Sequence, residues 1–232
     1  MDEFPMRINK YLAHRGISTR NKADELIKQG LVKINGKKAS LGDKVLENDK
    51  VSVENKIYNN FVYFAYNKPK GVVTTNPQER EKEILDNVKT KEKIFPVGRL
   101  DKNSYGLIIL TNDGRITDRL LNPDKNHEKE YVVEVDRKYS PAFLENLKKG
   151  VNIGDYKTKP AIVKKINDKK FSITLTEGKN RQIRRMTEKL GYTVKDLCRV
   201  RIQNIKLGNL KQNQYQELNE EEKNTFLKSL GL

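Results

Sequence analysis

The stretch GRLDKNSYGLIILTNDG, residues 98–114, joins one carboxylate to a short apolar run. Asp101 follows Gly-Arg-Leu, and the run Leu107–Leu110 comes a few residues later. A continuous apolar run bounded by turn residues predicts a fully buried strand, and Asn-Asp-Gly at 112–114 is a turn. Asp101 itself has two interpretations, a turn residue or a catalytic carboxylate, because Asp serves in both roles. The rest of the sequence has to decide between them.

The segment from residue 61 to 232 alternates strand and helix patterns. Ser140 with Pro141 is a helix start, and Gly150 is a helix end. The chain therefore predicts an α+β fold. The expected strands are 61–66, 72–75, 107–111, 131–135, 171–175 and 200–207, and the expected helices are 141–149, 180–190 and 218–230.

The first sixty residues predict a separate small unit. Apolar residues in 8–12 have helical spacing, and a second helix runs from Ser18 or Thr19 to Gly30. Asn35-Gly36 is a strong signal for a two-residue hairpin turn, and a further short strand covers 51–53. We expect an N-terminal domain over residues 1–56, a linker over 57–60 and a second domain over 61–232.

The overall charge predicts a polyanionic partner. The 232 residues include 47 Lys+Arg and 31 Asp+Glu, which gives a net charge of +16. Nucleic acid is the commonest such partner, and a membrane surface is the rival. No apolar run approaches the roughly 18 residues that span a bilayer, and no signal peptide is apparent. One cysteine, Cys198, excludes an internal disulfide and fits the cytosol, and two isolated histidines predict no metal site.

Basic residues gather in two places. On a helix over 180–190, Ile183 and Met186 fall on one side and three arginines on the other. This side, and a basic set in the first unit, fit either a solvated helix face or contacts with phosphate or carboxylate groups. Tyr131 begins a strand, where most tyrosines simply pack near the core. The three arginines are Arg181, Arg184 and Arg185, and the N-terminal set is Arg7, Lys10, Arg15, Arg20 and Lys22.

Two resemblances carry the functional hypothesis. Residues 7–53, RINKYLAHRG to KVSV, resemble the S4 RNA-binding domain in element order and in the VKINGK stretch. The remainder resembles the RsuA/RluF-type pseudouridine synthases in NKPKG, FPVGRLDKNSYGLIILTNDG, NHEKEYVVEV and LTEGKNRQIRRMTEKLGYTVKDLCRVRIQNIKL. HEKEYVV and GRLDKNSYGL look most like the RluF branch, which modifies large-subunit ribosomal RNA.

The resemblance implies the fold and the reaction. A two-helix S4 domain with a hairpin sheet would precede a catalytic domain built on a mixed, mainly antiparallel sheet with flanking helices. The reaction would turn a uridine of ribosomal RNA, most simply 23S RNA, into pseudouridine without a cofactor. The partner would be ribosomal RNA or a ribosomal assembly particle, and the protein would be a cytoplasmic monomer.

The resemblance also implies residue roles. Asp101 would be the catalytic carboxylate, as a nucleophile or as the base that removes the ribose 2′ proton. Tyr131 would stack on the target base, Arg184 would pair with Asp101, and Leu197 would border the base. Arg99 would fill the gap that the extruded base leaves, or contact a phosphate. The residues expected to contact RNA are Arg7, Lys10, Arg15, Arg20, Lys22, Lys68, Arg99, Lys179, Arg181 and Arg185.

Two other functions compete with this one. A non-catalytic RNA-binding protein would need only the basic faces, whereas the joint presence of Asp101, Tyr131 and Arg184 favours an enzyme. A DNA-binding regulator would need a major-groove motif and a dimer signature, and the sequence shows neither.

Overall fold

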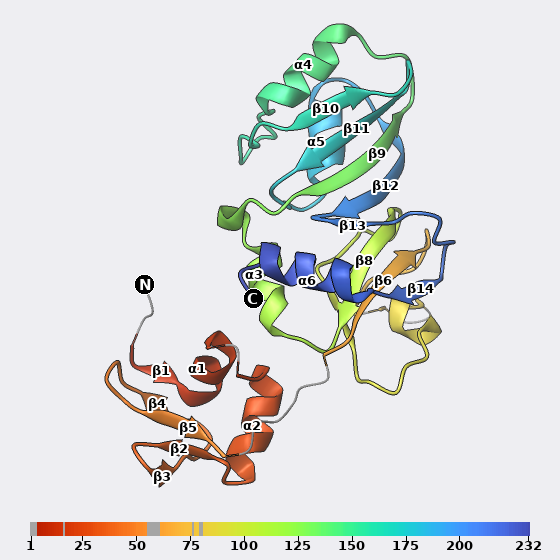
Figure 1. Cartoon of the computed structure of the whole chain (residues 1–232). Coiled ribbons are helices and arrows are strands. Elements are labelled where there is room, and N and C mark those ends of the chain that lie inside the picture. Colours follow the sequence, from red (N-terminus) through yellow and green to blue (C-terminus); the bar gives the residue numbers. More distant parts are fainter. Residues whose placement is uncertain (1–3, 16, 55–60, 76, 79–80) are drawn as a thin grey trace. The chain divides into compact units, whose positions relative to one another are not determined.

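Two compact units make up the chain. The computed structural model describes residues 4–15, 17–54, 61–75, 77–78 and 81–232. One unit comprises residues 1–62, 113–117 and 232, and the other comprises 63–112 and 118–231. The predicted linker, 57–60, lies outside the described residues, so the proposed domain boundaries stay predictions. Each unit is shown in Figure 1 and described by itself.

The N-terminal unit contains the two expected helices and the expected hairpin. The Thr19 side chain accepts a hydrogen bond from the Lys22 amide and caps the second helix. Asn35 and Gly36 both have positive φ, which a tight two-residue hairpin turn requires. Strands β1 and β4 form an additional pair that the sequence pattern did not predict. The elements are β1 (Met6–Arg7), α1 (Ile8–His14), α2 (Arg20–Lys28), β2 (Val32–Ile34), β3 (Lys37–Lys38), β4 (Lys44–Val45) and β5 (Val51–Val53).

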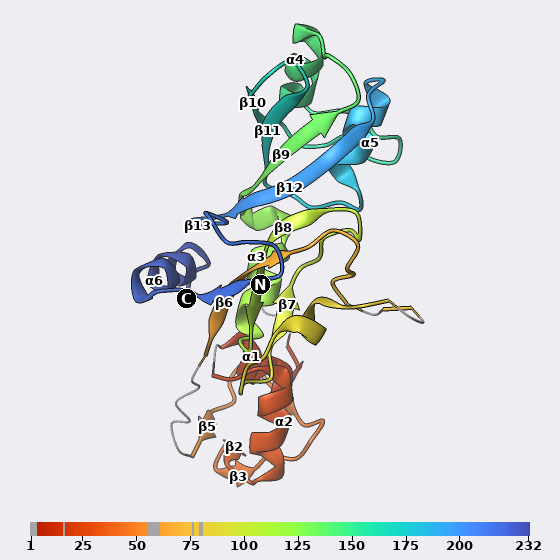
Figure 2. The same cartoon turned by 90° about the vertical axis from the view of Figure 1, so that its right-hand side faces the viewer.

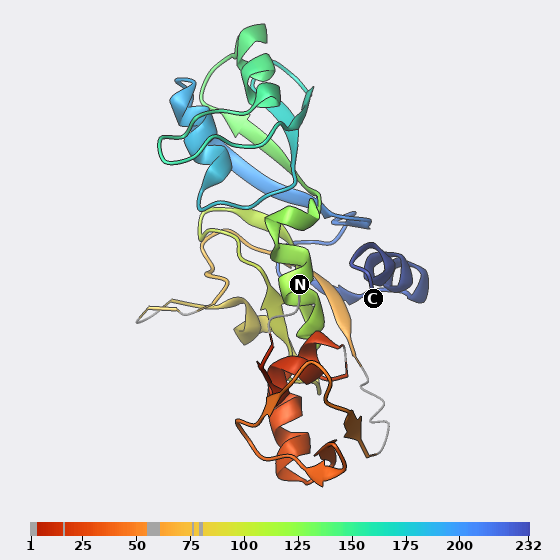
Figure 3. The same ribbon diagram turned by 90° about the vertical axis from the view of Figure 1, so that its left-hand side faces the viewer.

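The larger unit is built on one sheet with the order β10-β11-β9-β12-β8-β6-β14, with β13 paired to β12 and β7 to β8. Every pairing is antiparallel except β12 with β8, so the predicted mixed, mainly antiparallel sheet is confirmed. Figures 2 and 3 show β12 between β9 and β8 from two sides. The remaining elements are β6 (Tyr63–Lys68), η1 (Ile84–Asn87), β7 (Phe95–Val97), β8 (Tyr105–Thr111), α3 (Arg115–Leu121), η2 (Pro123–Lys125), β9 (Lys129–Val135), α4 (Pro141–Lys149), β10 (Ile162–Lys165), β11 (Lys170–Leu175), α5 (Gln182–Lys189), β12 (Val194–Ile202), β13 (Ile205–Lys206), β14 (Tyr215–Glu217) and α6 (Glu220–Ser229).

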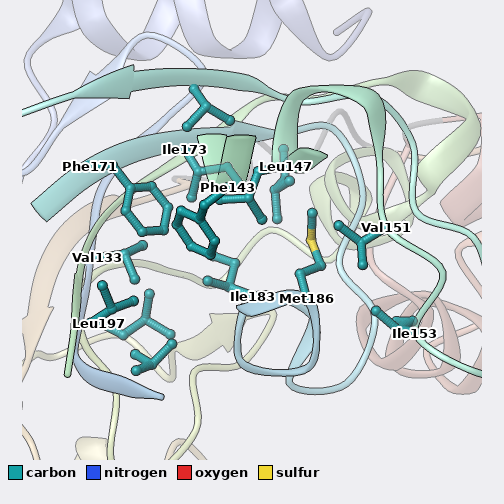
Figure 4. Packing of buried hydrophobic residues seen from close by; sticks show 14 residues of the cluster. Val133, Phe143, Leu147, Val151, Ile153, Phe171, Ile173, Ile183, Met186 and Leu197 are labelled. Carbon is teal, nitrogen blue, oxygen red and sulfur yellow. The ribbon is translucent and has the colours of Figure 1, made fainter. Parts of the chain in front are cut away.

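Helices α4 and α5 pack on the same part of this sheet. Phe143 of α4 and Met186 of α5 lie in one buried cluster with Phe171 of β11 and Val133 of β9 (Figure 4). Leu197 of β12 belongs to the same cluster. The amphipathic pattern of the sequence is therefore satisfied, because the apolar sides of both helices meet the buried side of β9, β11 and β12.

Three of the expected elements differ from the structure. The expected strand 200–207 is divided into the end of β12 and the antiparallel β13, with a turn between them where Gln203 has φ 50°. Residues 72–75 do not form a strand, since Val73 makes only a single bridge to Glu83. The Thr74 hydroxyl hydrogen-bonds the backbone of Leu100 instead, at 2.9 and 3.1 Å. Helix α5 begins at Gln182 rather than residue 180, because Arg181 has a left-handed backbone with φ 49°. The deviations at residues 72–75 and at the start of α5 lie beside the candidate site.

Candidate active site

Asp101 lies on the loop that joins β7 to β8, and this loop is tied down by backbone contacts. Thr74 bonds both the amide and the carbonyl of Leu100, and the Ser104 amide donates to the Asp101 carbonyl at 3.0 Å. Gly106, at the start of β8, has φ 107°, and a Cβ there would lie 2.3 Å from the carbonyl oxygen of Arg199. Only glycine allows β8 and β12 to approach this closely. These contacts give the Asp101 carboxylate a defined position.

Lys68 supports the same loop from beneath. Its side chain is fully buried, and its ammonium donates to the carbonyls of Pro69, Lys102 and Ser104 at 3.0, 3.4 and 2.8 Å. Burial lowers the pKa of Lys68 to about 8, and the charge of Asp101 partly opposes this shift. The prediction that Lys68 contacts RNA is therefore wrong, because a buried ammonium with three backbone acceptors has no path to a phosphate.

The depressed pKa of Lys68 predicts a pH-dependent contribution to folding. Between pH 8 and about 10.4 the unfolded chain holds the Lys68 proton and the native chain does not, so stability rises with pH. We expect the free energy of unfolding of the wild type, relative to Lys68→Met, to increase by up to roughly 3 kcal/mol across this window. Denaturant titrations of both proteins at several pH values measure the difference, in which the contributions of titrating groups that do not interact with Lys68 cancel. A difference that stays constant or shrinks with rising pH would contradict a depressed pKa.

Two guanidinium groups face the Asp101 carboxylate. Arg184 Nε lies 3.8 Å and Arg181 Nη1 lies 3.9 Å from Asp101 Oδ2, which is ion-pair distance but longer than a hydrogen bond. Arg184 is held in place through Ser104 Oγ at 3.2 Å and through the carbonyls of Asn103 and Val194 at 3.3 and 3.4 Å. Its Nε has no hydrogen-bond partner among the described residues. Burial lowers the pKa of Arg184, the nearby Arg181 adds to this effect, and Asp101 opposes it.

The Asp101 carboxylate faces a cavity of about 670 Å³ that lies within the larger unit. Tyr131 from β9 and Leu197 from β12 line it, so an aromatic ring and an apolar side chain from neighbouring strands face the same space. The structure thus brings together seven of the residues singled out from the sequence. They are Arg99, Asp101, Tyr131, Lys179, Arg181, Arg184 and Leu197.

A second carboxylate in the cavity wall, that of Glu177, already accepts three hydrogen bonds. Glu177 is buried and accepts hydrogen bonds from the Tyr156 hydroxyl at 2.6 Å, the Gln182 amide at 2.6 Å and the Lys159 backbone at 2.9 Å. In the described part of the chain, the side-chain oxygens of Asp101 make only the two long ion pairs, and the side chain is 32% exposed. Asp101 is therefore the wall carboxylate that is free to react.

The other predicted RNA-contact residues lie elsewhere. Arg185 points away from the cavity lining, where it donates to the Ile153 carbonyl at 2.9 Å and pairs with Asp155. In the N-terminal unit the basic side chains reach solvent. Arg7, Lys10, Arg15 and Arg20 are exposed and Lys22 is half-buried. Their contacts with RNA stay predictions.

Two buried cations in the wall were not predicted as site residues, although Arg199 continues the basic pattern that follows the helix over 180–190 in the sequence. Lys129 donates to the carbonyls of Leu120 and His127, and burial lowers its pKa to about 8. Arg199 is 4% exposed and donates from Nε to the Leu107 carbonyl at 2.7 Å. Strand alternation could have indicated them, because residues two apart on a strand point to the same side of the sheet. Lys129 lies two residues from Tyr131, and Arg199 lies two residues from Leu197.

Comparison with known proteins gives consistent results. Residues 62–189 match the family model described as RNA pseudouridylate synthase, and residues 6–51 match the S4 domain. The chain is 41% identical over 222 residues to the dual-specificity RNA pseudouridine synthase RluF of Escherichia coli K12, covering 94% of this chain and 77% of the relative. It is 37% identical to ribosomal large subunit pseudouridine synthase B of Bacillus subtilis, covering 83% and 84% of the two chains.

A solved structure is also similar. A crystal structure of a pseudouridylate synthase superposes with a TM-score of 0.71 at 28% identity, covering 97% of this chain and 99% of the other. Among the described residues, no helix has the length and apolar character needed to cross a membrane, and no group of three or more side chains is placed to hold a metal ion.

Proposed function

Because this chain belongs to the RNA pseudouridylate synthase family, we propose that it isomerises a uridine of large-subunit ribosomal RNA with Asp101 as the catalytic group. The observation that carries the role of Asp101 is its place in the cavity. It is a partly exposed carboxylate whose side chain accepts no hydrogen bond from the residues that the structure describes, and it faces two guanidinium groups at 3.8 and 3.9 Å. The large-subunit assignment is supported by the name of the Bacillus relative and by the RluF-type motifs.

The reaction requires a carboxylate rather than a redox group. The C1′–N1 bond of the uridine breaks, the uracil rotates, and C1′ joins C5, with no net oxidation. Asp101 either attacks C1′ as a nucleophile or removes the ribose 2′ proton as a base, and both roles need an ionised, accessible oxygen. The two arginines counter the charge of Asp101 and fix its direction, at the distance of an ion pair.

The cavity wall fits a uracil ring that has left its stack. Extrusion of a stacked base costs about a few kcal/mol, which contacts in the pocket must offset. Tyr131 offers an aromatic face and Leu197 an apolar side chain, and they lie on adjacent strands. The exposed Arg99 and Lys179 at the same cavity suit the phosphates on either side of the target nucleotide.

The N-terminal unit supplies affinity rather than chemistry in this proposal. Its exposed basic residues lie outside the cavity lining, and phosphate contacts release counterions. We expect the triple substitution Lys10→Ala, Arg15→Ala, Arg20→Ala to weaken RNA binding at physiological salt and to reduce the slope of log K against log salt by about two. The turnover number at saturating RNA should stay within about twofold of the wild type. Filter-binding titrations at several salt concentrations and single-turnover assays measure the two effects.

A charge-matched control separates position from total charge. Lys164, Lys211 and Lys228 are exposed lysines of the larger unit that do not line the cavity, and their triple alanine variant removes the same charge. Equal loss of affinity in both triple variants would mean that only net charge matters. A loss of turnover confined to the N-terminal variant would contradict the division of roles.

The proposed function is tested by mapping pseudouridine at nucleotide resolution. Unmodified large- and small-subunit ribosomal RNA, both free and in assembly particles, is incubated with the purified protein, and chemical sequencing locates each new pseudouridine. We expect conversion of one or a few specific uridines in the large-subunit RNA. Conversion only in the small-subunit RNA would overturn the subunit assignment. No conversion in either RNA, free or in particles, would overturn the proposed ribosomal substrate.

A further inference from the structure

Arg199 is a buried cation to which the proposed reaction so far gives no role. It lies on β12 directly opposite Tyr131 of β9 in the strand register, so the two side chains leave the same side of the sheet next to each other. Its Nε is held by the Leu107 carbonyl at 2.7 Å, and its Nη2 is buried without a hydrogen-bond partner among the described residues. An unpaired, buried guanidinium nitrogen destabilises the fold and calls for an explanation.

Arg199 lies near two other buried cations, Lys68 and Lys129, so the cavity wall around it is positively charged. Its charge lowers the pKa of Lys68 and of Lys129, after the larger effect of burial on each. Within the described ranges Arg199 forms no ion pair with a carboxylate, and the buried Glu177 is occupied by three neutral donors. Among the described residues, the positive charge of Arg199 and Lys129 therefore has backbone carbonyls as acceptors but no carboxylate to neutralise it.

We propose that Arg199, with Lys129 beside it, stabilises the negative charge that gathers on the uracil when the C1′–N1 bond breaks. The proposal rests on the proposed function. The bonding electron pair stays with the ring, so the detached uracil is an anion with its charge over N1 and the two carbonyl oxygens. If Asp101 acts as a nucleophile, its carboxylate oxygen bonds C1′ as the C1′–N1 bond breaks, and it leaves again when C5 bonds C1′. If Asp101 acts as a base, it takes the 2′ proton, a C1′–C2′ double bond forms, and the proton returns to C2′ when C5 bonds C1′. In both routes the C5 proton is then lost and N1 gains a proton.

The position of Arg199 suits this ring better than it suits an RNA phosphate. Tyr131 is the aromatic side chain proposed to face the uracil, and Arg199 is its direct cross-strand neighbour. Arg199 is 4% exposed and tied to Leu107, whereas Arg99 at the same cavity is exposed and has the reach for a phosphate. A charge held in place in a water-poor wall is most effective where charge develops during the reaction.

The two ligands have different kinetic consequences. A phosphate carries its charge before and after the reaction, so its loss would weaken RNA binding. The uracil anion exists only along the reaction path, so losing its partner slows bond cleavage at saturating RNA. We expect Arg199→Gln to slow cleavage of C1′–N1 by about 10²-fold or more, with RNA affinity within about twofold of the wild type. Arg199→Lys, which keeps the charge, should lose much less.

Substrates whose ring nitrogens differ in acidity distinguish a catalytic role of Arg199 from a structural one, because a structural defect would slow cleavage of both substrates equally. The ring nitrogen of 5-fluorouracil is more acidic than that of uracil, so this leaving group needs less stabilisation. Single-turnover cleavage of RNA containing uridine or 5-fluorouridine at the target position is measured for the wild type and each variant. The slowdown caused by Arg199→Gln should be about tenfold smaller with the fluorinated RNA.

A matched control lies two residues away on the same strand. Arg201 is fully paired, with Nε to Glu130 and Nη2 to Glu128 at 2.9 Å each, and does not line the cavity. Arg201→Gln should leave cleavage unchanged with both RNAs. Equal slowdowns of Arg199→Gln on both RNAs, or a loss of affinity without a loss of rate, would overturn the proposal. Circular dichroism checks that Arg199→Gln folds. If it does not fold, Arg199→Lys is tested in its place. A folded Arg199→Lys protein that cleaves both RNAs as slowly as Asp101→Asn would overturn the proposal. Absence of pseudouridine with the wild type would instead count against the proposed function.

Discussion

Arg184→Gln is expected to lower turnover by about 10²-fold or more at saturating RNA, while Arg185→Gln stays within about threefold of the wild type. Arg184 faces Asp101 Oδ2 at 3.8 Å and is fixed through Ser104 and two backbone carbonyls, so its loss changes both the charge around the carboxylate and the loop that carries it. Arg185 is the next residue on the same helix but bonds Ile153 and Asp155. Single-turnover rates and RNA affinities of both variants measure the contrast.

The remaining cation makes the contrast sharper. Arg181 stays 3.9 Å from the same oxygen in Arg184→Gln, so some rate should survive and a double variant with Arg181→Gln should lose more. Arg184→Lys keeps a charge without the planar fork and should fall between the wild type and Arg184→Gln. Equal losses for Arg184→Gln and Arg185→Gln would show that the pairing with Asp101 is not what matters.

Much of the fold follows from the sequence because local signals and burial agree. Asn35-Gly36 forms the expected hairpin turn, Ser140 with Pro141 begins α4, and the apolar run at 107–110 is fully buried in strand β8. Each of these depends on residues next to one another in the chain. The pairing of β12 parallel to β8 depends instead on the close contact of Gly106 with Arg199, which joins residues far apart in sequence.

The site residues likewise fall into those that the sequence predicts and those that depend on contacts between residues far apart in the chain. The family resemblance points to Asp101, Tyr131 and Leu197, which line one cavity in the structure. Lys68 was misassigned because a basic residue near a turn suggests a surface position, whereas its ammonium is enclosed by three carbonyls of two loops. The proposed role of Arg199 depends on a buried Nη2 that has no hydrogen-bond partner among the described residues. This depends on the three-dimensional packing and cannot be predicted from a sequence pattern.

Asp101→Asn should abolish turnover while folding and RNA binding survive. Asparagine has nearly the size and shape of aspartate, but it has no negative charge and cannot act as nucleophile or base. The loop should keep its conformation, because the contacts that hold it use the Asp101 backbone and the neighbours Leu100 and Ser104. We expect a loss of at least about 10⁴-fold in rate, because the substitution removes the wall carboxylate that, among the described residues, accepts no hydrogen bond.

The accompanying properties distinguish catalysis from a structural role. If Asp101 were only a turn residue, asparagine would serve nearly as well and activity would persist. Removal of a carboxylate from a site that binds phosphates should leave RNA affinity equal or slightly higher. Melting temperature by circular dichroism and affinity by filter binding, on the same preparations, check both points. A melting temperature more than a few degrees below that of the wild type would show that Asp101 also holds the loop.

The most direct test of Asp101 as the catalyst is tritium release from C5. Large-subunit ribosomal RNA is made with uridine that carries tritium at C5, and bonding of C5 to C1′ followed by loss of the C5 proton sends the label into water. Wild type and Asp101→Asn are incubated in excess with the same RNA. The account predicts stoichiometric release from the target uridine with the wild type and no release above background with Asp101→Asn. Release by Asp101→Asn at a rate near that of the wild type would contradict it.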